Sequence, residues 1–182
     1  MAMGWKAMVG VVALVACAAA PAAEMPRAMF LAEGGATVHG SYAVTAGASW
    51  PWNWQRATRG GQWSGATEVF ASHWSVRNRA GGREGYTQLG IAPVLRYRFG
   101  QGRSPWFVEA GIGVSWFDSV YETNRKRFST RFNFYDTIGV GRSFGQAREH
   151  EWSLRLTHIS NAGIRKPNPG EDVLQLRYTR NF

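Results

Sequence analysis

Cysteine, acidic residues and long apolar runs are all scarce in this sequence of 182 residues. Cys17 is the only cysteine, so no disulfide can form within the chain. Beyond residues 1–23, no stretch approaches the roughly 20 consecutive apolar residues of a transmembrane helix, which excludes a helical membrane protein. The remaining residues contain no linker, low-complexity tract or repeat, and their number predicts a single domain.

The first residues have the composition of an export signal. Lys6 is their only charged side chain, an apolar run covers residues 7–16, and small residues follow. The triplet Ala20–Ala22 fits an A-x-A cleavage site. We therefore predict a signal peptide over residues 1–23 and a mature domain over residues 24–182.

A second processing route remains open at Cys17. The triplet Leu14–Ala16 precedes this cysteine as in a lipoprotein signal, which would leave Cys17 acylated. Cleavage near Ala22 or Ala23 would instead remove Cys17 and leave a mature chain without cysteine. The absence of a disulfide is compatible with an oxidising compartment and does not identify one.

Basic residues outnumber acidic residues by 21 to 12, and the formal net charge is +9 at pH 7. In a soluble protein such an excess suggests a nucleic-acid partner, but the export signal argues against one. A basic exported protein could bind the anionic phosphates of lipopolysaccharide, or it could carry a solvated basic surface. Charge alone does not separate these two interpretations.

Eight segments alternate with a period of two residues and are separated by glycine-rich or charged turns, as expected for β-strands. They are Met29–Thr37, Ser41–Trp52, Gln62–Val76, Gly85–Phe99, Trp106–Asp118, Ser129–Phe144, Glu151–Ser160 and Asp172–Phe182.

Within these segments, one row of side chains is apolar and the opposite row is mixed. The apolar row of the fifth segment is Trp106, Val108, Ala110, Ile112, Val114 and Trp116. An apolar row with aromatic ends is typical of strands in a transmembrane barrel. The same alternation of side chains would also fit a soluble β-sandwich with its apolar face inward. The export signal, the aromatic ends and the strands of about ten residues favour the membrane.

The C-terminus agrees with export to the outer membrane. Phe182 ends the chain, with Tyr178, Leu176 and Leu174 on the same row and Arg180 breaking it. This ending resembles the sorting signal of bacterial outer-membrane barrels. We predict an all-β, eight-stranded antiparallel transmembrane β-barrel in the bacterial outer membrane, too narrow for a pore.

Other polar residues fit structural roles. Arg96, Arg98 and Glu109 lie on the inward row, and we predict that they form a buried polar network rather than a second active site. The remaining histidines are scattered and lack metal-ligand spacing; they are His39, His73 and His150. We therefore predict neither a metal nor a cofactor.

Residues 151–160 contain the clearest chemical pattern. In strand geometry His158 and Ser160 continue the apolar, lipid-facing row, with Cβ atoms about 7 Å apart. An imidazole can span that gap to reach a hydroxyl, and serine becomes a strong nucleophile when an adjacent base takes its proton. An isolated His-x-Ser is usually an interfacial histidine followed by a turn serine. Nothing structural, however, calls for that pair at the lipid-facing end of a strand.

A catalytic histidine usually needs an acid that orients it, and the next segment offers Glu171 and Asp172. Strand parity places Asp172 on the outward face with His158. Glu171 would point inward unless a bulge turns the start of the strand. Both residues remain candidates.

The sequence here resembles the PagL family of lipid A 3-O-deacylases. The resemblance rests on Thr157–Ile164 and Lys166–Glu171, and more weakly on Trp106–Gly113. It implies an outer-membrane esterase that removes the 3-O-linked acyl chain of lipid A without a metal. It also implies that His158 is the base and Ser160 the nucleophile.

The same resemblance bears on the remaining site residues. Asn161 matches a residue important for activity in the family. The family acid is a glutamate, which residue type places at Glu171 and ungapped spacing places at Asp172. Candidates to hold the oxyanion are Asn161, Asn168 and the amide of Gly163, although strict alternation points Asn161 inward.

The deacylase hypothesis makes lipopolysaccharide the substrate and excludes nucleic acid as a partner. Two alternatives stay open. One is a structural or adhesive barrel with a degenerate motif, and the other is an outer-membrane phospholipase. The sequence does not give the oligomeric state.

Overall fold

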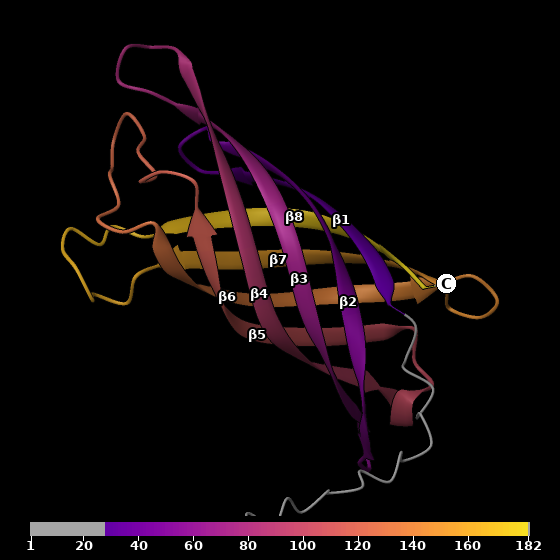
Figure 1. Cartoon of the computed structure of the whole chain (residues 1–182). Coiled ribbons are helices and arrows are strands. Elements are labelled where there is room, and N and C mark those ends of the chain that lie inside the picture. The colour runs from indigo at the N-terminus through magenta and orange to yellow at the C-terminus, as the bar shows by residue number, and fades with distance from the viewer. Residues whose placement is uncertain (1–27, 182) are drawn as a thin grey trace, which may run out of the picture.

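The computed structural model describes residues 28–181, which form a closed barrel of eight antiparallel strands (Figure 1). The strands are β1 (Met29–Thr37), β2 (Tyr42–Ala57), β3 (Gly61–Arg77), β4 (Arg83–Phe99), β5 (Trp106–Phe117), β6 (Phe132–Phe144), β7 (His150–Ser160) and β8 (Glu171–Arg180), with a short 3-10 turn, η1 (Gly100–Gly102), after β4. No helix in these residues is long and apolar enough to cross a membrane. The predicted signal peptide, Cys17 and Phe182 lie outside the described residues, so the expectations about them stay predictions.

The predicted number and order of strands are confirmed, and the largest errors concern two boundaries. β2 continues to Ala57 because a bulge between Pro51 and Gln55 restores its pairing with β3. β6 begins at Phe132 rather than Ser129. Ser129 lies in a loop instead, and its hydroxyl donates to the carbonyl oxygen of Arg165 at 2.7 Å.

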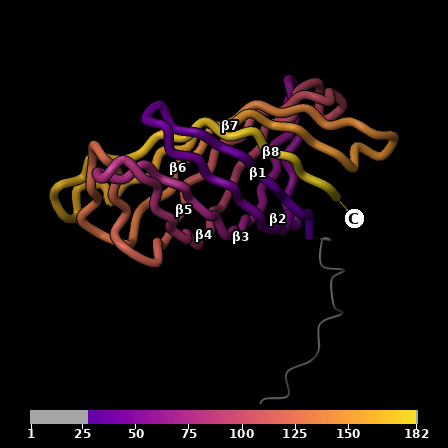
Figure 2. The backbone as a smooth tube through the Cα atoms, turned by 90° about the horizontal axis from the view of Figure 1, so that it is seen from above, coloured from indigo at the N-terminus to yellow at the C-terminus, as the bar shows by residue number. Residues whose placement is uncertain are grey.

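The barrel closes because β1 pairs with β8 as well as with β2. Closure leaves no open strand edge, so the backbone polar groups of the strands pair with one another. The start of β1, the end of β8 and the turns after β2, β4 and β6 lie at one end of the barrel (Figures 1 and 2). The loops after β5 and β7 lie at the opposite end, here called the loop end.

The outer face is apolar. Leu89, Ile112 and Ile138 expose 58%, 70% and 61% of their surface, which only a hydrocarbon environment would favour on one continuous face. Trp74 is the one buried tryptophan of the described residues; the exposed ones are Trp50, Trp52, Trp54, Trp63, Trp106, Trp116 and Trp152. The apolar row therefore faces outward as predicted, and the soluble sandwich is excluded.

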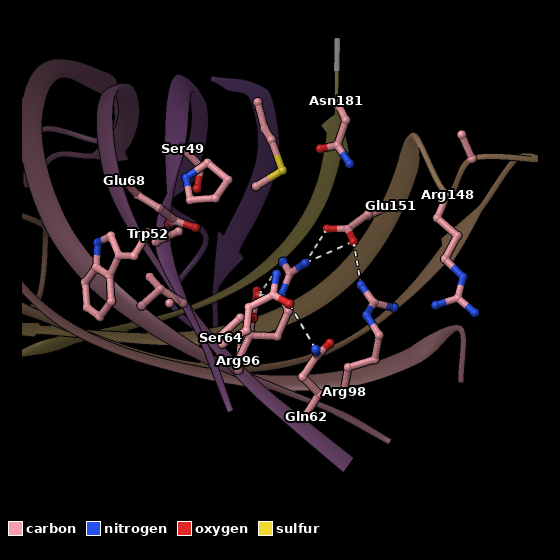
Figure 3. A pocket seen from close by; sticks show the side chains of 18 residues that line it. Ser49, Trp52, Gln62, Ser64, Glu68, Arg96, Arg98, Arg148, Glu151 and Asn181 are labelled. Carbon is pink, nitrogen blue, oxygen red and sulfur yellow. Dashed lines mark hydrogen bonds and ion pairs between the residues drawn. The ribbon is translucent and has the colours of Figure 1, made fainter. Parts of the chain in front are cut away.

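The interior is polar, and the predicted network of Arg96, Arg98 and Glu109 is confirmed. Arg96 contacts Glu109 at 2.9 Å and Glu151 at 2.8 Å. Arg98 contacts Glu151 at 3.0 Å. Figure 3 shows the two guanidinium groups converging on Glu151 at a cavity of about 240 Å³. This cavity lies near Met29 and Asn181, at the end of the barrel where β1 starts and β8 ends.

A second layer of ion pairs fills the middle of the barrel. Arg155 is fully buried and contacts Glu109 at 2.7 Å and Glu68 at 3.1 Å. Arg177 contacts Glu68 at 2.5 Å and also pairs with Glu33. Each buried charge therefore has a partner of opposite sign, which offsets its desolvation.

We expect Arg155→Met to lower the free energy of unfolding by about 3–5 kcal/mol, because it leaves buried carboxylates without their counter-ion. Chemical denaturation of the folded barrel in lipid vesicles measures the change. Arg125→Met is the matched control, because Arg125 is an exposed loop residue whose side chain has no partner among the described residues. Equal stability of the Arg155 variant and the control would show that the interior charges do not depend on each other.

The loop end of the interior is closed by aromatic side chains. Trp74, Phe117, Tyr121 and Phe128 are buried there and pack ring against ring. Tyr121 and Phe128 come from the loop between β5 and β6, residues 118–131, so this loop folds into the mouth of the barrel. Its position beside the end of β7 bears on the site.

Candidate active site

The end of β7 places two polar side chains on the lipid-facing surface. Leu154 and Leu156 are exposed, whereas Ser153, Arg155 and Thr157 point into the barrel. His158 follows on the outward row, with 47% of its side chain exposed. Ser160 ends the strand and is 8% exposed. In the β6–β7 register His158 pairs with Asp136 and Ser160 with Phe134, so both side chains lie on the outward row as predicted.

Asp172 lies directly opposite His158 in the β7–β8 register. Antiparallel partners project their side chains from the same face, so the carboxylate meets the imidazole. Its Oδ1 lies 2.7 Å from Nδ1 of His158. A carboxylate that accepts the Nδ1 hydrogen fixes the ring and leaves Nε2 free to take a proton. The geometry thus brings together the predicted base and one of the two candidate acids.

Glu171 occupies the other face of β8. It is 2% exposed, pairs with Ile159 in the register and points into the barrel. Its carboxylate accepts hydrogen bonds from Lys126 Nζ at 3.2 Å and from the Tyr121 hydroxyl at 3.0 Å. The bulge that would turn Glu171 outward is absent from the pairing of β7 and β8 in the described residues.

Ser160 lies where β7 enters the loop of residues 161–170. Its Oγ accepts a hydrogen bond from the backbone amide of Ala162 at 3.4 Å. The hydroxyl makes no other hydrogen bond within residues 28–181. The Ser160 hydroxyl is therefore not bonded to His158 in this state. Catalytic hydrogen bonds are often long before substrate binds and tighten in the complex.

Asn161 organises the loop after β7. Its Nδ2 donates to Ser129 Oγ at 2.9 Å and to the carbonyl oxygen of Arg165 at 2.8 Å. Its Oδ1 accepts the amide hydrogen of Gly163 at 2.9 Å. Asn161 is 1% exposed, so its side chain and the Gly163 amide are both engaged inside the loop.

Asn168 differs from the other two oxyanion candidates because half of its amide is free. Its Oδ1 accepts the backbone amide hydrogen of Asn161 at 3.0 Å. Its Nδ2 has no partner among residues 28–181. The bond to Oδ1 therefore fixes the plane of the amide while Nδ2 remains available as a donor.

A groove on the outer surface begins at His158 and Asp172. Its walls include Ile112, Ile138 and Leu156, and its volume is about 370 Å³. A second hollow of about 580 Å³ adjoins it along residues 110–112 and is bounded by the side chains of Trp52, Trp63, Pro93, Leu95, Tyr97 and Val108. Together they make a largely apolar track along the lipid-facing side of the barrel.

Comparison with known proteins finds relatives over nearly the whole chain. The family described as "Lipid A 3-O-deacylase (PagL)" matches residues 40–181. The lipid A deacylase PagL of Bordetella bronchiseptica is 34% identical over 97% of this chain and 96% of its own. The chain belongs to the PagL family.

Two further comparisons agree. The lipid A deacylase PagL of Pseudomonas aeruginosa is 31% identical over 94% of each chain. A solved structure titled "Crystal structure of the outer membrane enzyme PagL" superposes with a TM-score of 0.74, at 30% identity, over 85% of this chain and 99% of that one. This PagL-family protein is thus an outer-membrane β-barrel.

Two residues at the site were missed from the sequence. Asp136 lies in the groove, opposite His158 in the β6–β7 register. The carboxylate of Asp136 stands between Phe134 and Ile138 on the outward row of β6, and this was the signal that could have found it. Lys126 reaches the start of β8 from a loop 45 residues away, and no pattern in the sequence indicates that contact.

The described residues contain no candidate metal site. Within residues 28–181, no group of three or more His, Cys, Asp or Glu side chains is placed to hold a metal ion. The polar cavity of Figure 3 lies at the opposite end of the barrel from His158, and its guanidinium groups are held by Glu109, Glu151 and backbone carbonyls.

Proposed function

We propose that this protein hydrolyses the 3-O-linked acyl ester of lipid A, with Ser160 as nucleophile, His158 as general base and Asp172 as the acid that orients His158. The observation that carries the proposal is the 2.7 Å contact between His158 Nδ1 and Asp172 Oδ1 on the lipid-facing surface. His158 is two residues before Ser160 on β7, and the chain belongs to the PagL family.

The reaction follows from the chemistry of these groups. Nε2 of His158 takes the proton of the Ser160 hydroxyl while Oγ attacks the ester carbonyl, and the carbonyl oxygen becomes an oxyanion. Collapse of this intermediate expels the sugar oxygen, which receives the proton from His158. A water molecule then repeats the attack on the acyl-serine and releases the fatty acid. Asp172 stabilises the imidazolium that forms in both halves.

The apolar groove accounts for the lipid substrate. An acyl chain in a bilayer is already in hydrocarbon, so the hydrophobic effect does not drive its binding to the barrel. A groove that fits the chain supplies van der Waals contacts and aligns the ester with His158 and Asp172, which lie at the groove's end nearest the loop end of the barrel. The substrate need not leave the membrane to react.

The loop end carries basic side chains suited to the phosphates of lipopolysaccharide. Arg125, Arg165 and Lys166 are exposed there, and their side chains have no partner among residues 28–181. Unpaired guanidinium and ammonium groups bind phosphate oxygens with charge-assisted hydrogen bonds. This placement supports lipopolysaccharide as the partner of the basic surface.

Mass spectrometry of lipid A from cells with and without the protein tests the proposed function. A deacylase removes one 3-O-linked acyl chain, and the mass of lipid A falls by that chain. Unchanged lipid A with unchanged phospholipids would indicate a structural or adhesive barrel. Unchanged lipid A with newly formed lysophospholipids would indicate a phospholipase.

Asn168 provides a prediction about the oxyanion. Asn168→Asp keeps an oxygen for the amide hydrogen of Asn161 but loses the Nδ2 donor. We expect turnover to fall by about 10²–10³-fold, the usual effect of losing one oxyanion donor. Turnover by the purified barrel in detergent, with circular dichroism as the check on folding, gives the measurement. Full activity of Asn168→Asp would exclude Nδ2 as the donor.

A further inference from the structure

The loop between β5 and β6 is rigidly held before it reaches the site. The amides of Arg125 and Lys126 each donate to Thr123 Oγ1 at 3.0 Å, and the amide of Phe128 donates to the carbonyl oxygen of Tyr121 at 2.9 Å. The buried rings of Tyr121 and Phe128 anchor this turn in the barrel mouth. Lys126 is therefore presented from a fixed backbone.

Lys126 holds the first residues of β8 from inside the barrel. Its Nζ donates to the carbonyl oxygen of Gly170 at 2.8 Å and to Glu171 Oε1 at 3.2 Å. Tyr121 donates to the other carboxylate oxygen of Glu171 at 3.0 Å. Burial and the neighbouring Glu171 raise the pKa of the Tyr121 phenol, so this hydroxyl keeps its proton and remains a donor.

The opposite side of the same backbone touches the catalytic histidine. A Cβ placed on Gly170 would lie 2.7 Å from Cε1 and 3.3 Å from Nε2 of His158, so the glycine backbone packs against the imidazole edge. Gly170 has a φ of +64°, a conformation in which glycine is unstrained. Asp172, two residues on, binds Nδ1 of the same ring. Residues 170–172 therefore contact His158 on two sides.

We propose that Lys126 and Glu171 act together as positioning residues for His158. By holding the carbonyl of Gly170 and the side chain of Glu171 inside the barrel, Lys126 fixes the strand start that sets the imidazole against Gly170 and Asp172 outside it. The inference rests on the proposed function for its effect on turnover. Neither residue touches the reacting atoms.

The other cations of this loop have no such connection. Arg127 pairs with Glu122, with side chains 62% and 34% exposed, and does not contact β8 in the described structure. Arg125 is exposed and unpartnered. Lys126 is 18% exposed and Glu171 2%, so their pair is shielded from solvent and costs more to disrupt than a surface ion pair.

Lys126→Met tests the inference, with Arg127→Met as the matched control and Lys126→Arg as the conservative rescue. We expect Lys126→Met to lower kcat by about 10–100-fold through misplacement of His158, with KM within about twofold. Lys126→Arg should recover most of the loss, and Arg127→Met should leave kcat unchanged. Glu171→Gln should add little on the Lys126→Met background, because the two residues act as one unit.

A spectroscopic readout separates this inference from the proposed function. In the barrel labelled with ¹⁵N-histidine, the Nδ1–H signal of His158 reports its bond to Asp172 whether or not the protein turns over lipid A. His150, whose Nδ1 lies 2.7 Å from the Tyr178 hydroxyl at the other barrel end, serves as the internal reference. We expect Lys126→Met to shift or broaden the His158 signal and to leave that of His150 unchanged.

The outcomes are distinguishable. An unchanged His158 signal in folded Lys126→Met protein overturns the inference, even if turnover falls, and so does a normal kcat. A wild-type protein that leaves lipid A intact overturns the proposed function, and the signal of His158 still decides whether Lys126 positions it. If Lys126→Met does not fold, Glu171→Gln replaces it and is judged by the same signal.

Discussion

Ser160→Ala should abolish deacylation while leaving the barrel folded. The substitution removes one oxygen, whose hydrogen bond in the structure is the 3.4 Å contact from the Ala162 amide. Loss of a serine nucleophile costs about 10⁴–10⁶-fold in turnover, because the remaining groups only orient and polarise the substrate. His158→Ala should cause a loss of similar size, since the hydroxyl then has no base.

Release of the acyl chain from purified lipid A, followed by mass spectrometry, measures this loss. Ser153→Ala is the matched control, because Ser153 lies on the same strand but points into the barrel. Circular dichroism and the slower migration of unfolded barrel protein on gels check folding in all variants. Near-normal turnover by folded Ser160→Ala protein would rule out Ser160 as the nucleophile.

Asp172→Asn should lower turnover by about 10²–10⁴-fold. An amide at this position can turn its NH₂ group toward Nδ1 of His158, which favours the wrong tautomer and no longer stabilises the imidazolium. Ser160 and His158 remain in place in this variant, so we expect a smaller effect than for Ser160→Ala. Asp172→Glu should retain activity within about tenfold, because a glutamate fills this role in the PagL family.

The comparison with Glu171→Gln decides between the two candidate acids. Glu171→Gln should add little on the Lys126→Met background, and in the otherwise wild-type chain Asp172→Asn should lower turnover more than Glu171→Gln. The reason is that, of the two carboxylates, only that of Asp172 contacts His158. Steady-state kinetics of the single and double variants provide the measurement. If Asp172→Asn turns over normally and Glu171→Gln is inactive, Glu171 is the acid and the triad proposed above is wrong.

The sequence determined the barrel because its signal is local. In a strand, neighbouring side chains alternate between the two faces, so the apolar row of Trp106–Trp116 and the mixed row between its members identify a lipid-facing and an inward face without any tertiary information. The same rule placed His158 and Ser160 on one face and sent Arg96 and Glu109 inward, as the structure has them.

Only the tertiary structure decided what lies across from these residues. Parity put Asp172 on the same face as His158 but left open a bulge that would turn Glu171 outward. The regular β7–β8 register has no such bulge and sets Asp172 directly opposite His158. The loop between β5 and β6 brings Lys126 to Glu171 and Ser129 to Asn161, contacts that span 45 and 32 residues. Such contacts follow from how the closed barrel arranges its loops in space, and no short-range pattern in the sequence records them.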